Sequence, residues 1–455
     1  MPASTPEAFD ALVKKIEAIA QKNPSYYRRR LRLLACLGYG YIVLVFTLLL
    51  GGLVLIRQAL LATQGVASTS QLNVIIVLIA AGFVSLFFAP VKKPAGVVLT
   101  RAQVPQLYAM LDELSVVLKA PKLDTVILDV ELNAAIMQRP KFGIIGWHAN
   151  YLLLGLPLMQ VLSPEQFKAV VAHELAHLCG GDGRVAAWIY RVRKTWFELA
   201  ERFEQNRQGG LFFRKFFSWY GPFFKAYSFV HARSQEYEAD RRAAEIVDPK
   251  HKAEALIWLN LNASKLIKQF WPNFEQQSAD LAEPPGDYIS QLLSVLEKEI
   301  KPKEKLKWLA LRLAEQSTND STHPCLRDRL DALGYKVSAE LTSVEQRATV
   351  LLSQHLESLT QQLNQQWKKE HWQGWYLLRD RYRHRQQRLA ELDNKSQTLL
   401  TIEERVKQVA LHAVIGDNAR ISATVNSVLE QVPNHAAANY WLGWLLTEAE
   451  DTQLG

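Results

Sequence analysis

Residues 163–182 read SPEQFKAVVAHELAHLCGGD, and this stretch decides how the centre of the chain folds. Its first residues form a helix-start signature, because Ser163 can cap a helix, Pro164 suits the first turn and Gln166 can reach back to the cap. Mostly apolar residues continue the helix to the glycine pair at 180–181, where a helix is expected to end. The stretch therefore predicts one buried helix.

The middle of this helix carries His173-Glu174-Leu175-Ala176-His177. Histidines at i and i+4 share a helix face, so both imidazoles can reach one zinc ion, and Glu174 can act as general base on a metal-bound water. Two incidental histidines are the alternative, but chance would place this pattern in about one chain in a hundred of this length. Burying these side chains without a role is also costly. The motif predicts one zinc ion per chain.

A hydrolytic zinc site uses three protein ligands and leaves one position for water, so a third ligand must come from elsewhere. Residues 233–240 read RSQEYEAD, and the alanines in and after this stretch favour a helix. On a helix Glu236 and Asp240 share a face, whereas Glu238 points about 200° away from Glu236. We predict that Glu236 ligates zinc and that Asp240 hydrogen-bonds the far nitrogen of a ligating histidine. Glu238 is expected to be solvated beside an arginine; three surface acids are the alternative.

These motifs resemble the integral-membrane gluzincin metallopeptidases, the family that includes the HtpX heat-shock protease and the CAAX prenyl endopeptidases. HELAH at 173–177 is similar to the family's HExxH, and SQEYEAD at 234–240 to its SRxxEYxAD-like element, whose first glutamate is the zinc ligand. Ser234 lies one place off the family's spacing, with Arg233 before it, a departure expected to affect helix packing rather than the metal. The resemblance covers about residues 30–335 and implies a zincin-type α+β protease domain.

The stretch Thr322–Arg329 reads THPCLRDR and is similar to the family's THPPLxxRI element. The resemblance implies that His323 lies over the zinc, where it stabilises the oxyanion of the tetrahedral intermediate or covers the metal in a resting state. It also implies that Arg329 braces His323. By itself, a His-Pro pair in a polar loop is ordinary turn chemistry.

Short strands are predicted at 124–130 and 151–156, on either side of Asn133-Ala134. This dipeptide matches the family's Asn-Ala element near the edge strand beside the cleft. An extended peptide substrate could add to that edge through backbone hydrogen bonds, so Asn133 and Ala134 are expected to bind substrate.

Two charge-free apolar runs, Leu33–Ile56 and Leu72–Val91, precede this domain. Each has the roughly 20 residues that a helix needs to cross a membrane. Basic residues before the first run and at Lys92-Lys93 place the N-terminus and the protease domain in the cytoplasm by the positive-inside rule. A buried hairpin of a soluble protein is the alternative. With the family resemblance, we expect a bacterial inner-membrane protein.

Composition supports this interpretation. A net charge of +8 indicates an anionic partner, and the basic run at 28–32, directly before the apolar segment, favours a lipid bilayer. Only three cysteines occur among 455 residues, too few and too scattered for a disulfide framework or a CxxC zinc site, which suits a reducing compartment.

The segment 211–230 is strongly aromatic, with ten Phe, Trp or Tyr residues among twenty. Gly221-Pro222 is expected to break it into two short pieces. Aromatic residues mixed with Arg214, Lys215 and Lys225 suit the headgroup region of a bilayer; a core packed on the zinc helix is the alternative.

The C-terminal third has a helical texture. Residues 341–395 predict an exposed or bundled helical pair, and their interspersed acids argue against nucleic-acid binding. From about residue 402, Ile415-Gly416-Asp417 is echoed 34 residues later by Ala449-Glu450-Asp451, the period of a tetratricopeptide helix pair. The chain stops at Gly455, where the second helix of a further repeat is expected. A protein partner is the expected ligand of this region.

The predicted fold is mainly α with a small β-sheet. It comprises a cytosolic N-terminal helix (1–32), a transmembrane hairpin (33–93), a zinc metallopeptidase domain (94–335) and a helical C-terminal region (336–455). The predicted function is a membrane-anchored zinc endopeptidase that cleaves membrane-associated proteins or peptides, in membrane-protein quality control by resemblance to HtpX. A narrow-specificity processing protease and a membrane-tethered scaffold with a structural or idle zinc site are the alternatives; Glu174 argues against an idle site.

Overall fold

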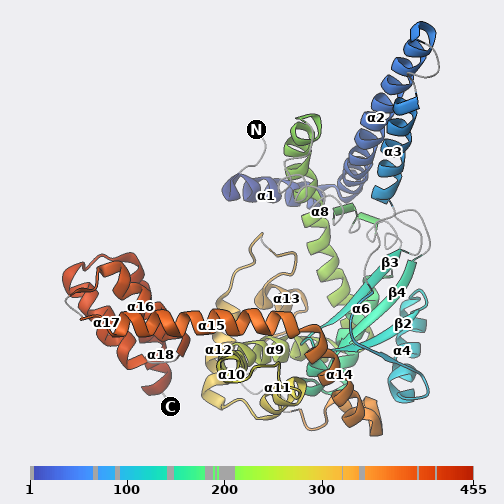
Figure 1. Ribbon diagram of the computed structural model, residues 1–455. Helices are drawn as coiled ribbons and strands as arrows, with labels where there is room; N and C mark the ends of the chain where they lie inside the picture. Colours follow the sequence, from blue (N-terminus) through green and yellow to red (C-terminus); the bar gives the residue numbers. More distant parts are fainter. Residues whose placement is uncertain are drawn as a thin grey trace.

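The computed structural model describes residues 5–64, 70–87, 93–140, 148–179, 188–189, 192–193, 211–319, 321–337, 344–396, 399–415 and 418–453. These residues are mostly helical and include one small mixed sheet, as the sequence predicts at this level. A hairpin of α2 and α3 projects from a central body that contains the sheet, and a bundle of α16, α17 and α18 lies at the far end of α15 (Figure 1).

The sheet has four strands in the order β1-β2-β4-β3. They are β1 Val97–Leu99, β2 Thr125–Asp129, β3 Ala134–Pro140 and β4 His148–Gly155. β2 runs parallel to β4, while β1 and β3 pair antiparallel at the two edges. The strands predicted at 124–130 and 151–156 are the two central strands, which are largely buried, as expected of apolar runs covered on both faces.

A glycine ends β4 where the chain passes close to the start of β3. The backbone N–H of Gly155 donates to the carbonyl of Asn133 over 2.9 Å. A Cβ at Gly155 would lie 1.7 Å from the carbonyl oxygen of Glu131, so no other residue fits without moving the backbone. This contact determines where the edge strand β3 begins.

Helix α6 (Pro164–Ala176) passes through the main hydrophobic core and packs against α8, α9 and β3. The predicted capping box is present, with reciprocal hydrogen bonds between Ser163 and Gln166. The predicted end near 180–181 is wrong by about one turn: the helix ends at Ala176, and i→i−3 hydrogen bonds from Leu178 and Cys179 tighten the chain there. The glycine pair itself lies outside the described residues.

Helix α8 (Leu211–Ile246) runs unbroken from the aromatic segment to Glu236, so the predicted break at Gly221-Pro222 is wrong. Gly221 has no Cβ to clash with the following proline ring, which removes one reason for the chain to leave the helix. Tertiary packing also stabilises the helix at this point. Tyr220 and Phe224 are buried on either side of the proline and stack with ring centroids 5.5 Å apart. The aromatic face packs on α1 (Pro6–Lys22) and α2 rather than on α6.

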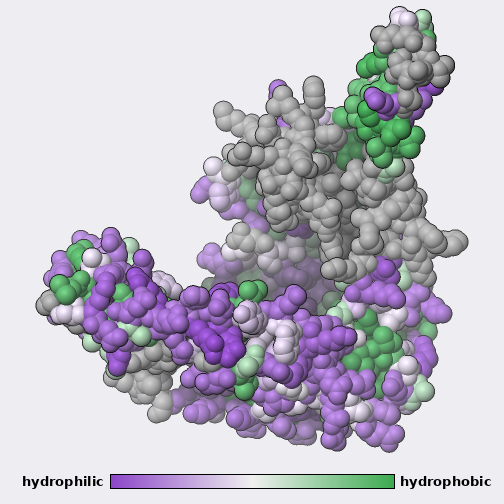
Figure 2. Space-filling model, in the orientation of Figure 1, coloured by the Kyte–Doolittle hydropathy of each residue, from purple (hydrophilic) through white to green (hydrophobic). Residues whose placement is uncertain are grey.

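Among the described residues one helix is long and apolar enough to cross a membrane, Pro24–Thr63 within α2 (Pro24–Gln64). It contacts α3 (Ser70–Phe87), whose shorter apolar part spans Gln71–Ala81. Positions 88–91 of the predicted second span lie outside the described residues. Figure 2 shows apolar side chains on this projecting hairpin. Because α2 begins at Pro24, the predicted boundary at residue 32 falls within a helix.

The other helices complete the body and the C-terminal region. They are α4 Pro105–Leu118, α5 Leu156–Val161, α9 Pro249–Lys265, a π-helix Leu266–Phe270, α10 Trp271–Asp280, α11 Tyr288–Glu297, α12 Pro302–Ala314, α13 Leu326–Ala332, a 3-10 helix Ala348–His355, α14 Leu356–Glu370, α15 Trp372–Asp393, α16 Ile402–Ile415, α17 Asn418–Gln431 and α18 Ala436–Gln453. Helix α14 docks on α11, with Trp367 stacked on Tyr288 at a centroid distance of 3.9 Å. The starts of α16 and α18 are 34 residues apart (436 − 402), the period read from the sequence.

Candidate metal centre

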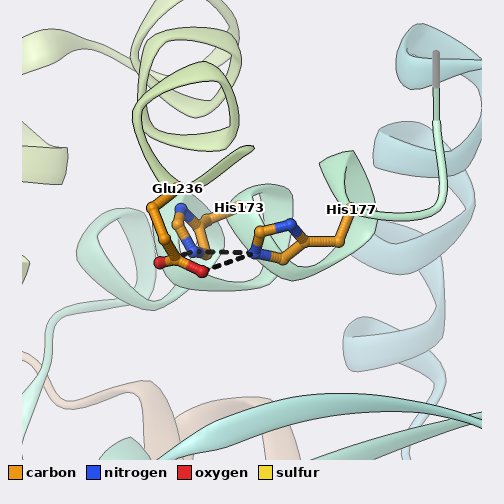
Figure 3. A group of neighbouring side chains, drawn as sticks. All are labelled: His173, His177 and Glu236. Carbon is orange, nitrogen blue, oxygen red and sulfur yellow. Dashed lines mark hydrogen bonds and ion pairs between the residues drawn. The ribbon is translucent and has the colours of Figure 1, made fainter. Parts of the chain in front are cut away.

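Three nitrogen- and oxygen-bearing side chains converge where α6 packs on α8 (Figure 3). His173 Nε2 lies 3.2 Å from His177 Nε2. Glu236 reaches both histidines, with Oε2 at 3.6 Å from His173 Nε2 and Oε1 at 3.6 Å from His177 Nε2. These three side chains form a cluster that could hold a metal ion.

The spacing of the donor atoms fits zinc. In a tetrahedral site with donors 2.0–2.1 Å from the ion, neighbouring donors lie about 3.3 Å apart. Here the two imidazole nitrogens are 3.2 Å apart and each lies 3.6 Å from a different oxygen of Glu236. With one ligand atom taken from each residue, the three atoms lie within 4.8 Å of one another. Two imidazole nitrogens that face each other at 3.2 Å either share a proton or, where both are unprotonated, can be held together by a cation between them. The residues therefore fit the ion that the sequence predicts.

The protonation states of the cluster also suit a metal. Burial, together with the neighbouring His173, lowers the pKa of His177 to about 4, so its imidazole is neutral and can ligate. Burial alone would raise the pKa of Glu236, but the neighbouring His173 and the hydrogen bond with His323 outweigh it and hold that pKa below its usual range. Glu236 is thus ionised at neutral pH and able to ligate a metal ion.

Asp240 lies one turn beyond Glu236 on α8 and holds His173 from behind. Its Oδ1 is 2.8 Å from His173 Nδ1, which leaves Nε2 of that ring facing the cluster. Arg329 donates to both Asp240 oxygens, from Nε and Nη2, over 2.7 Å each. The prediction that Arg329 braces His323 is therefore corrected, because Arg329 binds Asp240 instead. The guanidinium of Arg329 makes two parallel hydrogen bonds to the planar carboxylate of Asp240.

Lys252 on α9 joins Arg329 as a second cation beside Asp240, and the sequence did not indicate it. Its side chain is 2% exposed, and Nζ lies 3.0 Å from Asp240 Oδ1. Burial lowers the pKa of Lys252, against the attraction of Asp240. In the sequence it appears as one charge in the polar stretch PKHKAEA, which looks like a solvated helix start, and no local signal distinguishes it.

Glu174 is partly buried beside the ligand cluster. Burial raises the pKa of its carboxyl, and the neighbouring His173 and Lys252 oppose that rise. A carboxylate with a raised pKa is a stronger base than a solvated one, which suits a group that must accept and return a proton near neutral pH.

His323 lies in the loop before α13 and is 64% exposed. Its Nδ1 is 2.8 Å from Glu236 Oε2, and this hydrogen bond is the main cause of the raised pKa of His323. The structure thus brings His323 to the ligand cluster, where it contacts a ligand carboxylate.

Ala134 begins β3, an edge strand of the sheet, and Asn133 directly precedes it. Ala134 pairs with Leu154 of β4, and β3 packs against α6. The edge strand and the helix that carries the histidines are therefore neighbours, as substrate addition at this edge requires.

A pair of histidines from one helix with a glutamate from another is a ligand set of zinc hydrolases. The sequence profile of peptidase family M48 matches residues 105–337, just over half of the chain, and includes all three side chains. The chain belongs to peptidase family M48, which indicates a metallopeptidase. No curated protein and no solved structure matches the chain. The predicted metallopeptidase family is thereby confirmed.

Asp240→Asn is expected to weaken zinc binding by about 10- to 100-fold, because His173 loses its charged partner. It should also destabilise the fold by about 3–5 kcal/mol, since Lys252 and Arg329 lose their shared buried counter-charge. Adding Lys252→Met should recover part of the stability but not the zinc affinity. Competition with a chromogenic chelator and thermal unfolding measure the two effects; unchanged zinc affinity would remove Asp240 from the site.

Proposed function

We propose that this chain is a membrane-anchored, zinc-dependent endopeptidase whose ion is held by His173, His177 and Glu236. The convergence of these donors, at distances close to those between the donors of a tetrahedral zinc site, carries the proposal. Membership of peptidase family M48 supplies the reaction class, hydrolysis of peptide bonds.

The chain's own groups divide the chemistry between them. When bound, zinc supplies a Lewis acid that lowers the pKa of a coordinated water towards 7. Glu174 accepts a proton from the attacking water and returns it to the leaving amine. His323 donates a hydrogen bond to the substrate oxygen that becomes negative. Its contact with Glu236 then represents a resting arrangement from which the ring turns to meet substrate.

The projecting hairpin is proposed as the membrane anchor, with the N-terminus and the protease domain in the cytoplasm of a bacterial inner membrane. The long apolar helix Pro24–Thr63 and its exposed apolar side chains support an anchor. The aromatic segment extends along it: Phe216 stacks on Tyr41, inside the predicted span, at a centroid distance of 3.7 Å. This contact supports a position of the aromatic segment at the bilayer surface.

Substrates are proposed to be membrane-associated proteins or peptides that add as a strand along β3, beginning near Asn133 and Ala134. The edge position of β3 and its packing on α6 support this binding mode. A role in membrane-protein quality control rests on the resemblance to HtpX. Helices α16–α18 are proposed as a tetratricopeptide-like site for a protein partner, supported by the 34-residue spacing and by the exposed Tyr440 and Leu446.

The test is cleavage of casein and of an unfolded membrane protein by the detergent-purified full chain. The zinc-loaded chain is expected to be active. The activity should disappear when a chelator is added and return when zinc is restored. A zinc-loaded chain that cleaves neither substrate would favour the membrane-tethered scaffold. Cleavage confined to one peptide or lipidated tail would favour the narrow processing protease.

The orientation gives a separate prediction. In a variant with Cys36→Ser and Cys179→Ser, the partly exposed Cys325 is the remaining thiol. A membrane-impermeant maleimide should label it in inverted vesicles and not in intact spheroplasts. Ser68→Cys with Cys325→Ser, placed between the two predicted spans, should show the opposite pattern. Labelling of Cys325 from outside the cell would reverse the proposed topology.

A further inference from the structure

The loop that carries His323 connects α12 to α13. One side of the loop is tied to α13: Ser317 Oγ lies 2.6 Å from Asp328 Oδ2 and accepts a hydrogen bond from the Cys325 N–H over 2.8 Å. Near His323, the Ser321 hydroxyl accepts from the backbone N–H of His323 over 3.2 Å. The described residues at the tip of the loop, 318, 319 and 321, face two other helices.

Arg233 of α8 joins the loop tip to the N-terminal helix. Its Nη2 donates to the carbonyl oxygens of Thr318 and Ser321, the latter over 3.3 Å. Its Nη1 lies 3.5 Å from Glu17 Oε1 on α1. The guanidinium also lies 4.5 Å from the Phe229 ring centroid, and the side chain is only 13% exposed. One guanidinium thus bridges three segments that are distant in sequence.

A second, independent contact links α1 to the same loop. Asn319 Nδ2 donates to Asp10 Oδ1 over 2.7 Å. Asp10 and Glu17 are seven residues apart, two helical turns, so α1 presents both acids on one face. The same helix packs on α8 through Phe9, whose ring is edge-to-face with Phe229 at 6.3 Å.

We propose that Arg233 is a positioning residue that holds the described part of the His323 loop, residues 318–319 and 321–323, against α8 and thereby sets where His323 meets the metal site. Arg233, which holds the loop tip, and Glu236, which His323 contacts, lie three residues apart on the same helix, so the bonds from Arg233 help to set the distance between the His323 ring and Glu236. His323 is largely exposed, so packing of its own side chain does little to fix it.

The proposal extends to α1 as the outer support of this loop. Glu17 orients the guanidinium, and Asp10 holds the loop directly. Only Asn23 separates α1 from α2, so the support is joined to the proposed membrane anchor. The position of His323 is therefore coupled to how the N-terminal segment sits on the protease body. The effect on turnover rests on the proposed endopeptidase function; the effect on the loop does not.

The test compares Arg233→Met, Arg233→Lys and the wild type as full-length, zinc-loaded protein in detergent. Loss of the charge-assisted bonds should speed amide exchange in residues 316–323 by about ten-fold or more. It should lower kcat for casein by about ten-fold and leave KM within about two-fold, because the loop holds a group needed after substrate binds. Zinc content should stay the same. In Arg233→Lys, loop exchange and kcat should lie between those of wild type and Arg233→Met, since one ammonium cannot bridge both carbonyls and Glu17.

Arg241→Met is the matched control. Arg241 is on the same helix but pairs with the surface acids Glu238 and Glu245, so its loss should leave loop exchange and kcat unchanged. If Arg233→Met does not fold, Asp10→Ala with Glu17→Gln removes the outer support at two solvent-accessible positions and should speed the same exchange. Loop exchange equal to wild type in the folded variants overturns the proposal. If the wild type has no protease activity but the loop exchanges faster in Arg233→Met, the endopeptidase proposal is wrong and the positioning role of Arg233 in the loop is retained.

Discussion

Replacing Glu174 with glutamine is expected to lower kcat for casein cleavage by about 10²- to 10⁴-fold, the usual contribution of a positioned general base. Glutamine has nearly the same shape but cannot accept a proton at neutral pH. The change should leave the zinc content at that of wild type, because Glu174 is not among the three converging donors. Steady-state kinetics and elemental analysis on the same preparations measure both quantities.

The raised pKa of Glu174 adds a second readout for this variant. The wild-type rate should fall as the pH drops through the pKa of this carboxyl, because the protonated acid is no base. The residual rate of Glu174→Gln should lack that acid limb. Glu174→Gln activity equal to wild type would exclude the assigned role, whatever the zinc content.

Glu236→Ala is expected to remove zinc from the purified protein and to abolish activity with it. Alanine leaves only two imidazole ligands, which is one fewer than a catalytic zinc site provides. It also removes the carboxylate that His323 contacts and that lies near both ligating histidines. The zinc content measured by elemental analysis should fall from about one ion per chain to a small fraction of that.

Glu238→Ala is the matched control for this prediction. Glu238 lies two residues further along the same helix and pairs with Arg241 and Arg242 on its outer side, as expected from the helical period. Its replacement should leave zinc content and activity near wild type, since partly exposed ion pairs contribute little to stability. If Glu236→Ala retained a full complement of zinc, or if both variants lost it equally, Glu236 would not be the third ligand.

The locally encoded parts of the site could be predicted from the sequence. The spacing of His173 and His177, the cap at Ser163 and the separation of Glu236 from Glu238 all follow from the 3.6-residue period of one helix. Such relations extend over only a few residues, so no knowledge of the fold is needed. The apolar length of the N-terminal helix is likewise a local property.

The parts that were wrong or absent depend on contacts between distant segments. The helix passes through Pro222 because aromatic side chains on both sides of it pack onto α1 and α2. Arg329 binds Asp240 rather than His323, a choice between partners that helix packing decides. A local pattern cannot rank these alternatives, because their energies come from packing and burial.

By itself the sequence determined the donor set: two imidazoles on one helix face and a carboxylate on another, each placed by helical periodicity. Only the tertiary structure decided which residues support the donors. Lys252 and Arg329 pair with Asp240, and Arg233 bridges α1 and the His323 loop. The physical reason is that a buried or bridging charge is stable only where partners from other segments surround it. Those partners are neighbours in space and not in sequence.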